Sequence, residues 1–320
     1  MKHLGEAETE EERVAEAVIS ANPEWAGSDV RYTLLCPDVV SPVHRGVESA
    51  VWRVQTNNGA PTVLKIMRED MRAHFDLEAS VEGARRAGEA EAGPPVLWAD
   101  SSSGAVSMPL LGEGWRTATL WEFQDQSIMA QVLDTVKRLH SAAPLKHRFD
   151  IFTETQTLCA RARAAGVDLP PDFWWLETAL DDIAAAVAAS GTDIAPCRND
   201  GVSSNVMVGP DCAVMLLDYD RAGMNDPLYD LAALIVEAYP FETEMLPVIE
   251  QWCGRADPEI LNRCIAYGVA DDLMWALWGA IAAQESPRTH VEFRKYSEWR
   301  FLRCRSSLGD PRFEERLRRL

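Results

Sequence analysis

The sequence lacks the features that mark secreted, membrane-spanning and disulfide-stapled proteins. Its first residues, MKHLGEAETEEER, contain no apolar core after the basic positions, so we expect no secretory signal. No stretch approaches the roughly 18 apolar residues that a membrane span requires. Seven cysteines are present without a C-x-x-C pair. This usage is typical of reduced, mostly buried thiols in a cytoplasmic protein, and it indicates no zinc site.

Positive charge is also scarce. The 31 Lys and Arg residues are outnumbered by 50 Asp and Glu residues, which gives a formal net charge of −19. This balance argues against nucleic acid or an anionic membrane as the main partner. It favours cationic ligands through electrostatic steering, although a surface charged only for solubility would have the same composition.

The 320 residues, 47% hydrophobic and 25% charged, have the composition of an ordinary globular protein that is too long for one compact core. The first part of the chain contains short β-like stretches and two helical stretches. From residue 120 onward the chain shows long helical patterns. We therefore predict an α+β, bilobal fold, with a small β-rich N-lobe over residues 1–108 and a larger, mainly helical C-lobe over residues 109–320.

Individual elements follow from hydrophobic periodicity and turn residues. Strands are expected at residues 31–35, 50–56, 61–66, 96–99 and 105–108, and the second and third of these are joined by a turn over residues 57–59. Helices are expected at residues 8–21, 72–90, 127–141, 153–165, 173–189, 228–237 and 260–283.

Residues 196–226 carry the clearest chemical pattern. Asp200 and Asn205 are five positions apart in one irregular segment, and Asp218 ends the apolar run 213–217. Phosphoryl transfer from ATP to an alcohol needs a carboxylate that accepts the hydroxyl proton, and an Asn and a second carboxylate that hold magnesium ions. Protein kinases place these groups at this spacing. The segment therefore predicts a phosphotransferase.

The alternative is that these acids only cap turns and helices. Asp readily serves such positions, and Asp226 immediately before Pro227 is a typical helix N-cap. For Asp226 and Asp220 both interpretations stay open.

The segment resembles the choline/ethanolamine kinases and the related aminoglycoside phosphotransferases, which share the protein-kinase-like fold. Their C-H-N-D-x-x-x-x-N, I-D-[FW]-E-Y and [FY]-D-[IL]-A motifs correspond here to residues 197–205, 217–220 and 229–232. The resemblance implies ATP and Mg²⁺ as cofactors.

The same resemblance assigns roles to individual residues. It implies that Asp200 is the catalytic base, that Asn205 and Asp218 are magnesium ligands, and that Asp230 braces the catalytic loop from the following helix. Arg198 replaces the family's His. That His is usually a structural prop, so we expect a structural role for Arg198.

Two features of the first third extend the resemblance. Residues 45–52 are similar to the family's nucleotide-covering loop, which implies that Gly46 and Ser49 contact the cofactor. Lys65 lies in V-L-K-I, where the family places the residue that grips the α- and β-phosphates.

The family pairs that lysine with a Glu on the next helix. Glu78 and Glu82 lie one turn apart on the same predicted helical face. The sequence does not choose between them, and spacing favours Glu82 as the partner of Lys65.

The C-terminal region carries the information on the acceptor. Residues 273–278 resemble the L-W-x-L-W stretch of choline kinases, and residues 291–296 a loose F-D-Y-x-x-Y. We predict that Trp275, Trp278 and Tyr296 contact the substrate, since aromatic cages bind quaternary ammonium groups. Core packing of these aromatic residues is the alternative. Asp220 is also assigned to the substrate side.

The predicted function is ATP-dependent phosphorylation of a small cationic alcohol, with choline or ethanolamine favoured. An aminoglycoside, another metabolite or a peptide Ser/Thr is an alternative acceptor, because the fold does not fix the substrate. The alternative from a different class is a pseudokinase that binds nucleotide or a partner without turnover.

Overall fold

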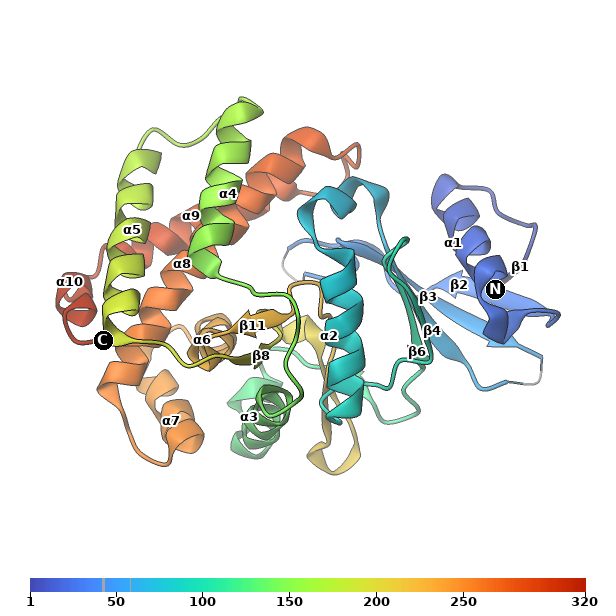
Figure 1. Cartoon of the computed structure of the whole chain (residues 1–320), viewed down its shortest axis with the longest axis horizontal. Helices are drawn as coiled ribbons and strands as arrows, with labels where there is room; N and C mark the ends of the chain where they lie inside the picture. The colour runs from blue at the N-terminus through green and yellow to red at the C-terminus, as the bar shows by residue number, and fades with distance from the viewer. Residues whose placement is uncertain (42–43, 58) are drawn as a thin grey trace.

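The computed structural model describes residues 1–41, 44–57 and 59–320. A strand-rich first third packs beside a larger helical part (Figure 1). This arrangement confirms the α+β class predicted from the sequence. The turn predicted over residues 57–59 includes residue 58, which lies outside the described residues.

The first third is built on an antiparallel sheet with the strand order β1-β2-β3-β4-β6-β5. Its strands are β1 (Lys2–His3), β2 (Val30–Leu34), β3 (Ser49–Thr56), β4 (Thr62–Met67), β5 (Trp98–Asp100) and β6 (Ala105–Pro109). In β4, Leu64 and Ile66 are buried in the small core that also contains α1 residues. Lys65 between them therefore points to the opposite face, since side chains alternate along a strand.

Helix α1 (Glu10–Ala21) begins at a capping box formed by Thr9 and Glu12, and it covers the face of the sheet opposite to Lys65. Helix α2 (Leu77–Glu89) lies between this sheet and the helical part of the chain (Figure 1). The helix predicted over residues 72–90 starts five residues late, because Asp76 accepts the first free amides and caps the helix at that point.

The helical part contains a long buried helix, α8, around which α4–α7, α9 and α10 pack. Its helices are α3 (Gln126–His140), α4 (Ile151–Ala164), α5 (Phe173–Ser190), α6 (Pro227–Ala238), α7 (Glu242–Cys253), α8 (Pro258–Glu285), α9 (Phe293–Leu308) and α10 (Phe313–Leu317). Short 3₁₀ helices are η1 (Pro23–Trp25), η2 (Glu69–His74), η3 (Glu122–Gln124), η4 (Ser203–Asn205) and η5 (Pro210–Cys212). The sequence predicted α3–α6 and α8 within a few residues but missed α7, α9 and α10.

Two small antiparallel sheets hold the segment that carries the chemistry. One pairs β8 (Ala195–Cys197) with β11 (Gly223–Asn225), and the other has the order β10 (Val214–Leu216), β9 (Val206–Val208), β7 (Arg116–Thr117). The loops between these strands lie next to the Lys65 face of the large sheet, as the ion pairs described below show.

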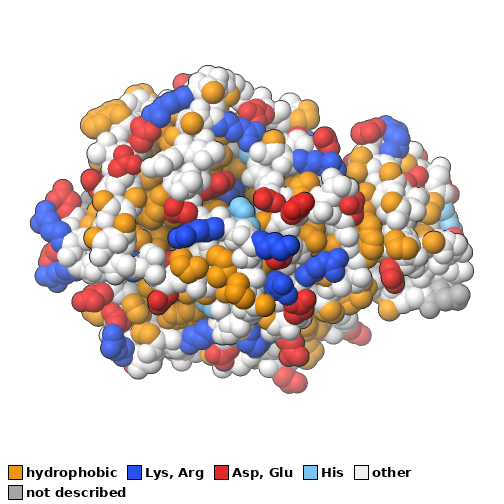
Figure 2. Space-filling model, in the orientation of Figure 1, with side chains coloured by type: hydrophobic (Ala, Val, Ile, Leu, Met, Phe, Trp, Pro, Cys, Tyr) orange, Lys and Arg blue, Asp and Glu red, His pale blue; other side chains and the backbone are white. Residues whose placement is uncertain are grey.

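Acidic and basic side chains are interspersed over the face of the molecule shown in Figure 2. The net charge of −19 is therefore not gathered into one patch on this face. No helix in the described residues combines the length and the apolar character that crossing a bilayer requires.

Candidate active site

The loop after β8 is held in place by one buried carboxylate from the next helix. Asp230, in the first turn of α6, accepts the backbone N–H of Arg198 at 3.0 Å and that of Asn199 at 2.6 Å. His140 Nε2 lies 2.9 Å from the same carboxylate. Asn199 adopts a positive φ of 59°, which Asn tolerates better than most residues. Asp230 thus braces the loop at its sharpest turn.

Arg198 ties together three backbone carbonyls of the site. Its Nη1 donates to the carbonyls of Asn205 and Leu217, both at 3.1 Å, and its Nη2 donates to the carbonyl of Asp200. The residue is buried. Its guanidinium therefore fixes both ends of the 200–205 loop against the end of β10, which is a structural role.

Asp200 lies at the start of that loop with its carboxylate held by two donors. It accepts the Val202 N–H at 2.8 Å and the Asn205 Nδ2–H at 2.6 Å. Burial raises the pKa of Asp200 and the nearby Asp218 adds to this effect, while Arg198 opposes it. A fixed carboxylate with a raised pKa is suited to accept a proton from a hydroxyl group.

Lys65 reaches across from β4 to two carboxylates on the opposite side of the cleft. Its Nζ lies 2.8 Å from Asp218 Oδ1 and 2.7 Å from Asp220 Oδ1. Burial alone would lower the pKa of Lys65, but the two carboxylates override it and raise the pKa. Lys65 in turn lowers the pKa of Asp218 against the effect of burial. Burial and the Asp218 charge raise the pKa of Asp220 to about 7.

The prediction that Glu82 pairs with Lys65 is wrong in this structure. Glu82 accepts the backbone N–H of Lys146 at 3.0 Å, and both Glu78 and Glu82 line a cavity on the outer side of α2. The inner face of α2 carries small residues, because it packs too closely against the segment that contains Ala222 for longer side chains to fit. A Cβ on Gly83 would lie 2.3 Å from the Ala222 side chain.

The inner face of α2 instead contributes a hydroxyl group. Ser80 donates to Asp220 Oδ1 at 2.6 Å, so this helix supports Lys65 through Asp220. The second oxygen of Asp220, Oδ2, is buried and has no hydrogen-bond partner among the described residues.

A cavity of about 370 Å³ lies between the large sheet and the helical part. It is lined by Lys65, Asn205 and Asp218, by the predicted loop residues Gly46 and Ser49, and by apolar side chains such as Val51, Val63, Met108 and Leu217. Gly46 has a φ of +63°, and a Cβ there would lie 3.2 Å from the Pro37 carbonyl. Mostly apolar walls with a few convergent polar groups are typical of small-ligand sites.

Trp275, Trp278 and Tyr296 are brought together, but they do not surround an open cavity. The two Trp rings are edge-to-face at 5.2 Å, and Tyr296 lies 6.3 Å and 6.1 Å from them. The imidazole of His44 occupies the space among them, with ring centroids 5.5 Å from Trp275, 5.8 Å from Trp278 and 5.4 Å from Tyr296. All three aromatic residues are buried.

The open space that remains beside Asp200 amounts to about 20 Å³, enough for about one water molecule. Its lining joins the predicted residues Asp200, Asn205, Asp218, Asp220 and Trp275 to residues that the sequence reasoning missed: His44, Glu48, Phe75, Val202 and Arg221. Arg221 directly follows Asp220, so its position next to the motif was a usable signal. No comparable signal marked His44.

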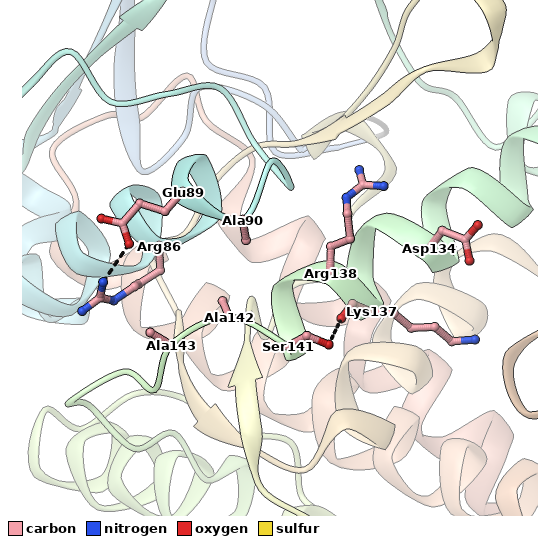
Figure 3. A pocket seen from close by; sticks show the side chains of 9 residues that line it. All are labelled: Arg86, Glu89, Ala90, Asp134, Lys137, Arg138, Ser141, Ala142 and Ala143. Atoms are coloured by element: carbon pink, nitrogen blue, oxygen red, sulfur yellow. Dashed lines mark hydrogen bonds and ion pairs between the residues drawn. The ribbon is translucent and has the colours of Figure 1, made fainter.

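A different cavity, of about 610 Å³, lies between α2 and the C-terminal end of α3 (Figure 3). Its basic residues already have partners: Arg86 pairs with Glu89 at 2.7 Å, and Lys137 donates to the Trp252 carbonyl at 2.8 Å. It contains none of the predicted site residues.

Comparison with known proteins gives results that agree with this geometry. The sequence profile of the phosphotransferase enzyme family matches residues 39–263. Protein LicA of Haemophilus influenzae is 26% identical over 201 residues, which cover 58% of this chain and 56% of LicA. Probable choline kinase 3 of Arabidopsis thaliana is 24% identical over 218 residues, 58% of this chain and 62% of that protein. The chain thus spans a little over half the length of these relatives.

Solved structures extend the similarity to nearly the whole chain. A choline/ethanolamine kinase family protein from Mesorhizobium loti is 25% identical, with a TM-score of 0.79 over 96% of this chain and 98% of its own. The choline kinase LicA from Streptococcus pneumoniae, at 16% identity, has a TM-score of 0.75 over 94% of this chain and 99% of its own. These likenesses confirm the predicted protein-kinase-like fold.

Proposed function

Because this chain belongs to the phosphotransferase enzyme family, we propose that it transfers the γ-phosphoryl group of ATP to the hydroxyl of a small amino alcohol, with choline or ethanolamine favoured. The observation that carries this proposal is the convergence of Asp200, Asn205, Asp218 and Lys65 on one cleft beside a cavity of nucleotide size. The names of the relatives, LicA choline kinase and probable choline kinase 3, support the choice of acceptor.

Asp200 is the proposed base. Each of its carboxylate oxygens accepts one hydrogen bond, Oδ1 from Val202 and Oδ2 from Asn205, and these contacts fix the orientation of the group. In this proposal it accepts the hydroxyl proton as the oxygen attacks the γ-phosphorus in line. The proton moves to Asp200 and the new O–P bond forms as the bond to the departing ADP oxygen breaks. Lys65 would donate to the α- and β-phosphate oxygens, in exchange for part of its present contact with Asp218.

The donor set near Lys65 fits magnesium. Oxygen ligands from carboxylates and Asn side chains are those that Mg²⁺ takes, and Asp220 Oδ2 is buried without a partner among the described residues. Asn205 and Asp218 would hold the ion, since both line the proposed nucleotide cavity. When bound, Mg²⁺ would neutralise the negative charge that develops on the phosphate groups.

The remaining assignments belong to the same proposal. Gly46, in the loop before β3, and Ser49, the first residue of β3, would cover the phosphates. Trp275, Trp278 and Tyr296 would contact the acceptor after His44 has moved. The proposal keeps the division into an N-lobe (1–108) and a C-lobe (109–320), with the nucleotide cavity between the two lobes. Seven thiols, all unpaired in the structure, support a reducing, cytoplasmic location.

The test is phosphate transfer from Mg-ATP to a panel of amino alcohols, with wild type compared to Asp200→Asn. We expect Asp200→Asn to lose at least about 100-fold in kcat, which is the range for loss of a general base. The matched control is Asp211→Asn, which removes the same charge at an exposed turn position. Equal transfer by wild type and Asp200→Asn would contradict the assignment.

The second candidate, a nucleotide-binding module without turnover, has one observation in its favour. Lys65 is committed to two carboxylates, and the space beside Asp200 holds little more than one water molecule. An increase in Tm with ATP, together with no transfer to any alcohol, would support this candidate over the enzyme.

A further inference from the structure

The acceptor side of the cleft contains a buried cation that the catalytic scheme does not use. Arg221 follows directly after Asp220 and lines the small cavity that also contains Asp200. Only 7% of the residue is exposed. Nη1 donates to Glu154 Oε1 at 3.2 Å, and Glu154 is itself partly exposed.

Two nitrogens of this guanidinium have no hydrogen-bond partner among the described residues. They are Nε and Nη2, both buried. The N–H groups of Nε and Nη2 point from the same edge of the planar guanidinium, which is an edge that a carboxylate bridges with two parallel hydrogen bonds. Other buried arginines in the described part of the chain leave at most one nitrogen unpaired.

The orientation of this edge is fixed by stacking. The guanidinium carbon of Arg221 lies 4.6 Å from the centroid of the Trp275 ring and 5.0 Å from that of Phe75. Both rings line the same cavity. A cation clamped between two aromatic rings cannot easily rotate toward solvent, so its unpaired donors stay available to a ligand.

Four carboxylates, those of Glu48, Asp200, Asp218 and Asp220, line the cavity beside Arg221, but most of their charge is already matched by cations. The acids Asp218 and Asp220 are paired with Lys65, Glu48 is paired with His44, and Arg198 lies near Asp200. Arg221 has only its single contact with Glu154. A plain cation placed beside Trp275 would meet the charge of Arg221, whereas the carboxylate of a zwitterion would occupy Nε and Nη2, next to the contact that Glu154 makes with Nη1.

We propose that the acceptor is a zwitterionic amino alcohol and that Arg221 selects it by binding its carboxylate through Nε and Nη2. The inference rests on the proposed function, keeps its amino-alcohol class and changes the favoured acceptor from choline or ethanolamine to a carboxylated counterpart. The ammonium group is directed to the aromatic residues around Trp275, the carboxylate to Arg221 and the hydroxyl to Asp200.

Matched pairs of alcohols test the proposal. Serine is ethanolamine with a carboxylate added, and N,N,N-trimethylserine is choline with the same addition. With the wild-type protein and Mg-ATP, we expect kcat/KM to favour the carboxylated member of at least one pair by about tenfold or more, the range for hydrogen bonds to a charged group.

Two variants locate the effect at Arg221. Arg221→Met keeps the apolar stem but removes the donors, and it should bring the ratio within each pair to about one or below. Arg221→Lys keeps the charge without the forked edge, so it should retain part of the preference. Arg305→Met is the matched control, because Arg305 also lies over an aromatic ring and binds a carboxylate, but away from the cavity. Its ratios should equal those of the wild type.

The outcomes separate this inference from the proposed function. Transfer to choline or ethanolamine with equal or better efficiency than to the carboxylated partners overturns the role of Arg221 and leaves the kinase assignment standing. Transfer to none of the four contradicts the kinase assignment. In that case calorimetric titration of the four compounds tests the inference separately. Loss of serine binding in Arg221→Met supports the inference. Equal binding of serine and ethanolamine by the wild type overturns it.

Discussion

His44 Nε2 lies 2.6 Å from Glu48 Oε1, and this buried pair fills the space among the aromatic residues that the sequence assigned to the acceptor. The pair comes from the same loop as Gly46, which lines the cavity of about 370 Å³. In this state the loop holds its own imidazole where an acceptor's ammonium group is expected. Acceptor binding then requires displacement of His44.

The first prediction concerns that displacement. In His44→Ala the imidazole no longer fills the space among the aromatic residues. The protein therefore does not have to displace a side chain before the acceptor can bind. We expect the KM for the preferred acceptor to fall by about tenfold, the factor for a competent state populated near one-tenth in the wild type. Steady-state kinetics with the acceptor varied at saturating Mg-ATP measure this change.

The control for His44 is His3→Ala, since His3 is exposed and interacts with Asp29 at the far edge of the sheet. Its KM should match that of the wild type. An unchanged or higher KM in His44→Ala would show that the imidazole supports the acceptor site instead of blocking it.

The same pair predicts a pH dependence of stability. Burial alone would lower the pKa of His44, but the Glu48 carboxylate, with a smaller contribution from Asp200, raises it against the opposing charge of Arg300. A raised folded-state pKa stabilises the protein fully below the unfolded value of about 6.5, and this contribution is lost as pH rises through the folded value. The free-energy difference between wild type and His44→Gln should therefore shrink from about pH 6 to pH 9. Urea denaturation at each pH measures it, and a constant difference would contradict the charged pair.

Arg198 gives a prediction about the catalytic loop. Its guanidinium donates to the carbonyls of Asn205, Leu217 and Asp200, so Arg198→Met leaves three acceptors without their partner. We expect a loss of about 3 kcal/mol in the free energy of unfolding, at about 1 kcal/mol for each buried group. Arg198→Lys cannot reach all three carbonyls and should be intermediate. If denaturation curves of Arg198→Met and wild type coincide, Arg198 does not brace the loop.

Much of this fold and part of the site could be predicted because the information is local in sequence. Helices α3–α6 and α8 follow from periodic apolar residues and their caps, and the 200–218 segment carries its chemistry in the spacing of three polar residues. Helix α7 was missed because Pro247 lies inside it, and proline normally argues against a helix interior.

Helix α9 was missed for a different reason. Its sequence is rich in arginine, and Ser297 and Arg300 interrupt the buried face that Phe293, Tyr296, Phe301 and Cys304 form. Arg300 is buried because it pairs with Asp272 at 2.9 Å and lies 3.5 Å from Asp271 on α8. Such pairing of buried charges between two helices depends on their tertiary contact. The partners of Lys65 also depend on tertiary contact. The close packing at Gly83 determines them, and the sequence spacing of Glu82 does not.

Arg288 supports a prediction about the loop that carries His44. It contacts Asp38 Oδ2 at 3.0 Å and Asp70 Oδ2 at 2.9 Å, so it ties the loop to the α8–α9 connection. In Arg288→Met the loop loses this anchor, and its bridge between Val39 and Arg45 should open more often. We expect hydrogen exchange at these two amides to accelerate by about tenfold, the effect of losing roughly 1.4 kcal/mol of local stability.

The matched control is Arg294→Met, which removes an exposed arginine with carboxylate partners near the start of α9. Exposed ion pairs contribute little, so exchange at Val39 and Arg45 should stay unchanged. Equal acceleration in both variants would mean that the effect does not pass through the Asp38–Arg288 contact.

Gly201 tests how closely the catalytic loop must pack on α6. A Cβ at this position would lie 2.1 Å from the backbone carbon and oxygen of Ala233, a contact that only movement of the backbone can relieve. Because Gly201 directly follows Asp200, that movement displaces the proposed base. We expect Gly201→Ala to lower kcat by at least about 100-fold, since a shift of about 1 Å in a reacting group can cost this much, and to lower stability by about 3 kcal/mol. Gly112→Ala is the control, because a Cβ there meets no atom within 4 Å. Retention of kcat in Gly201→Ala would show that the loop can relax away from α6 without moving Asp200, and that the contact with Ala233 does not position the base.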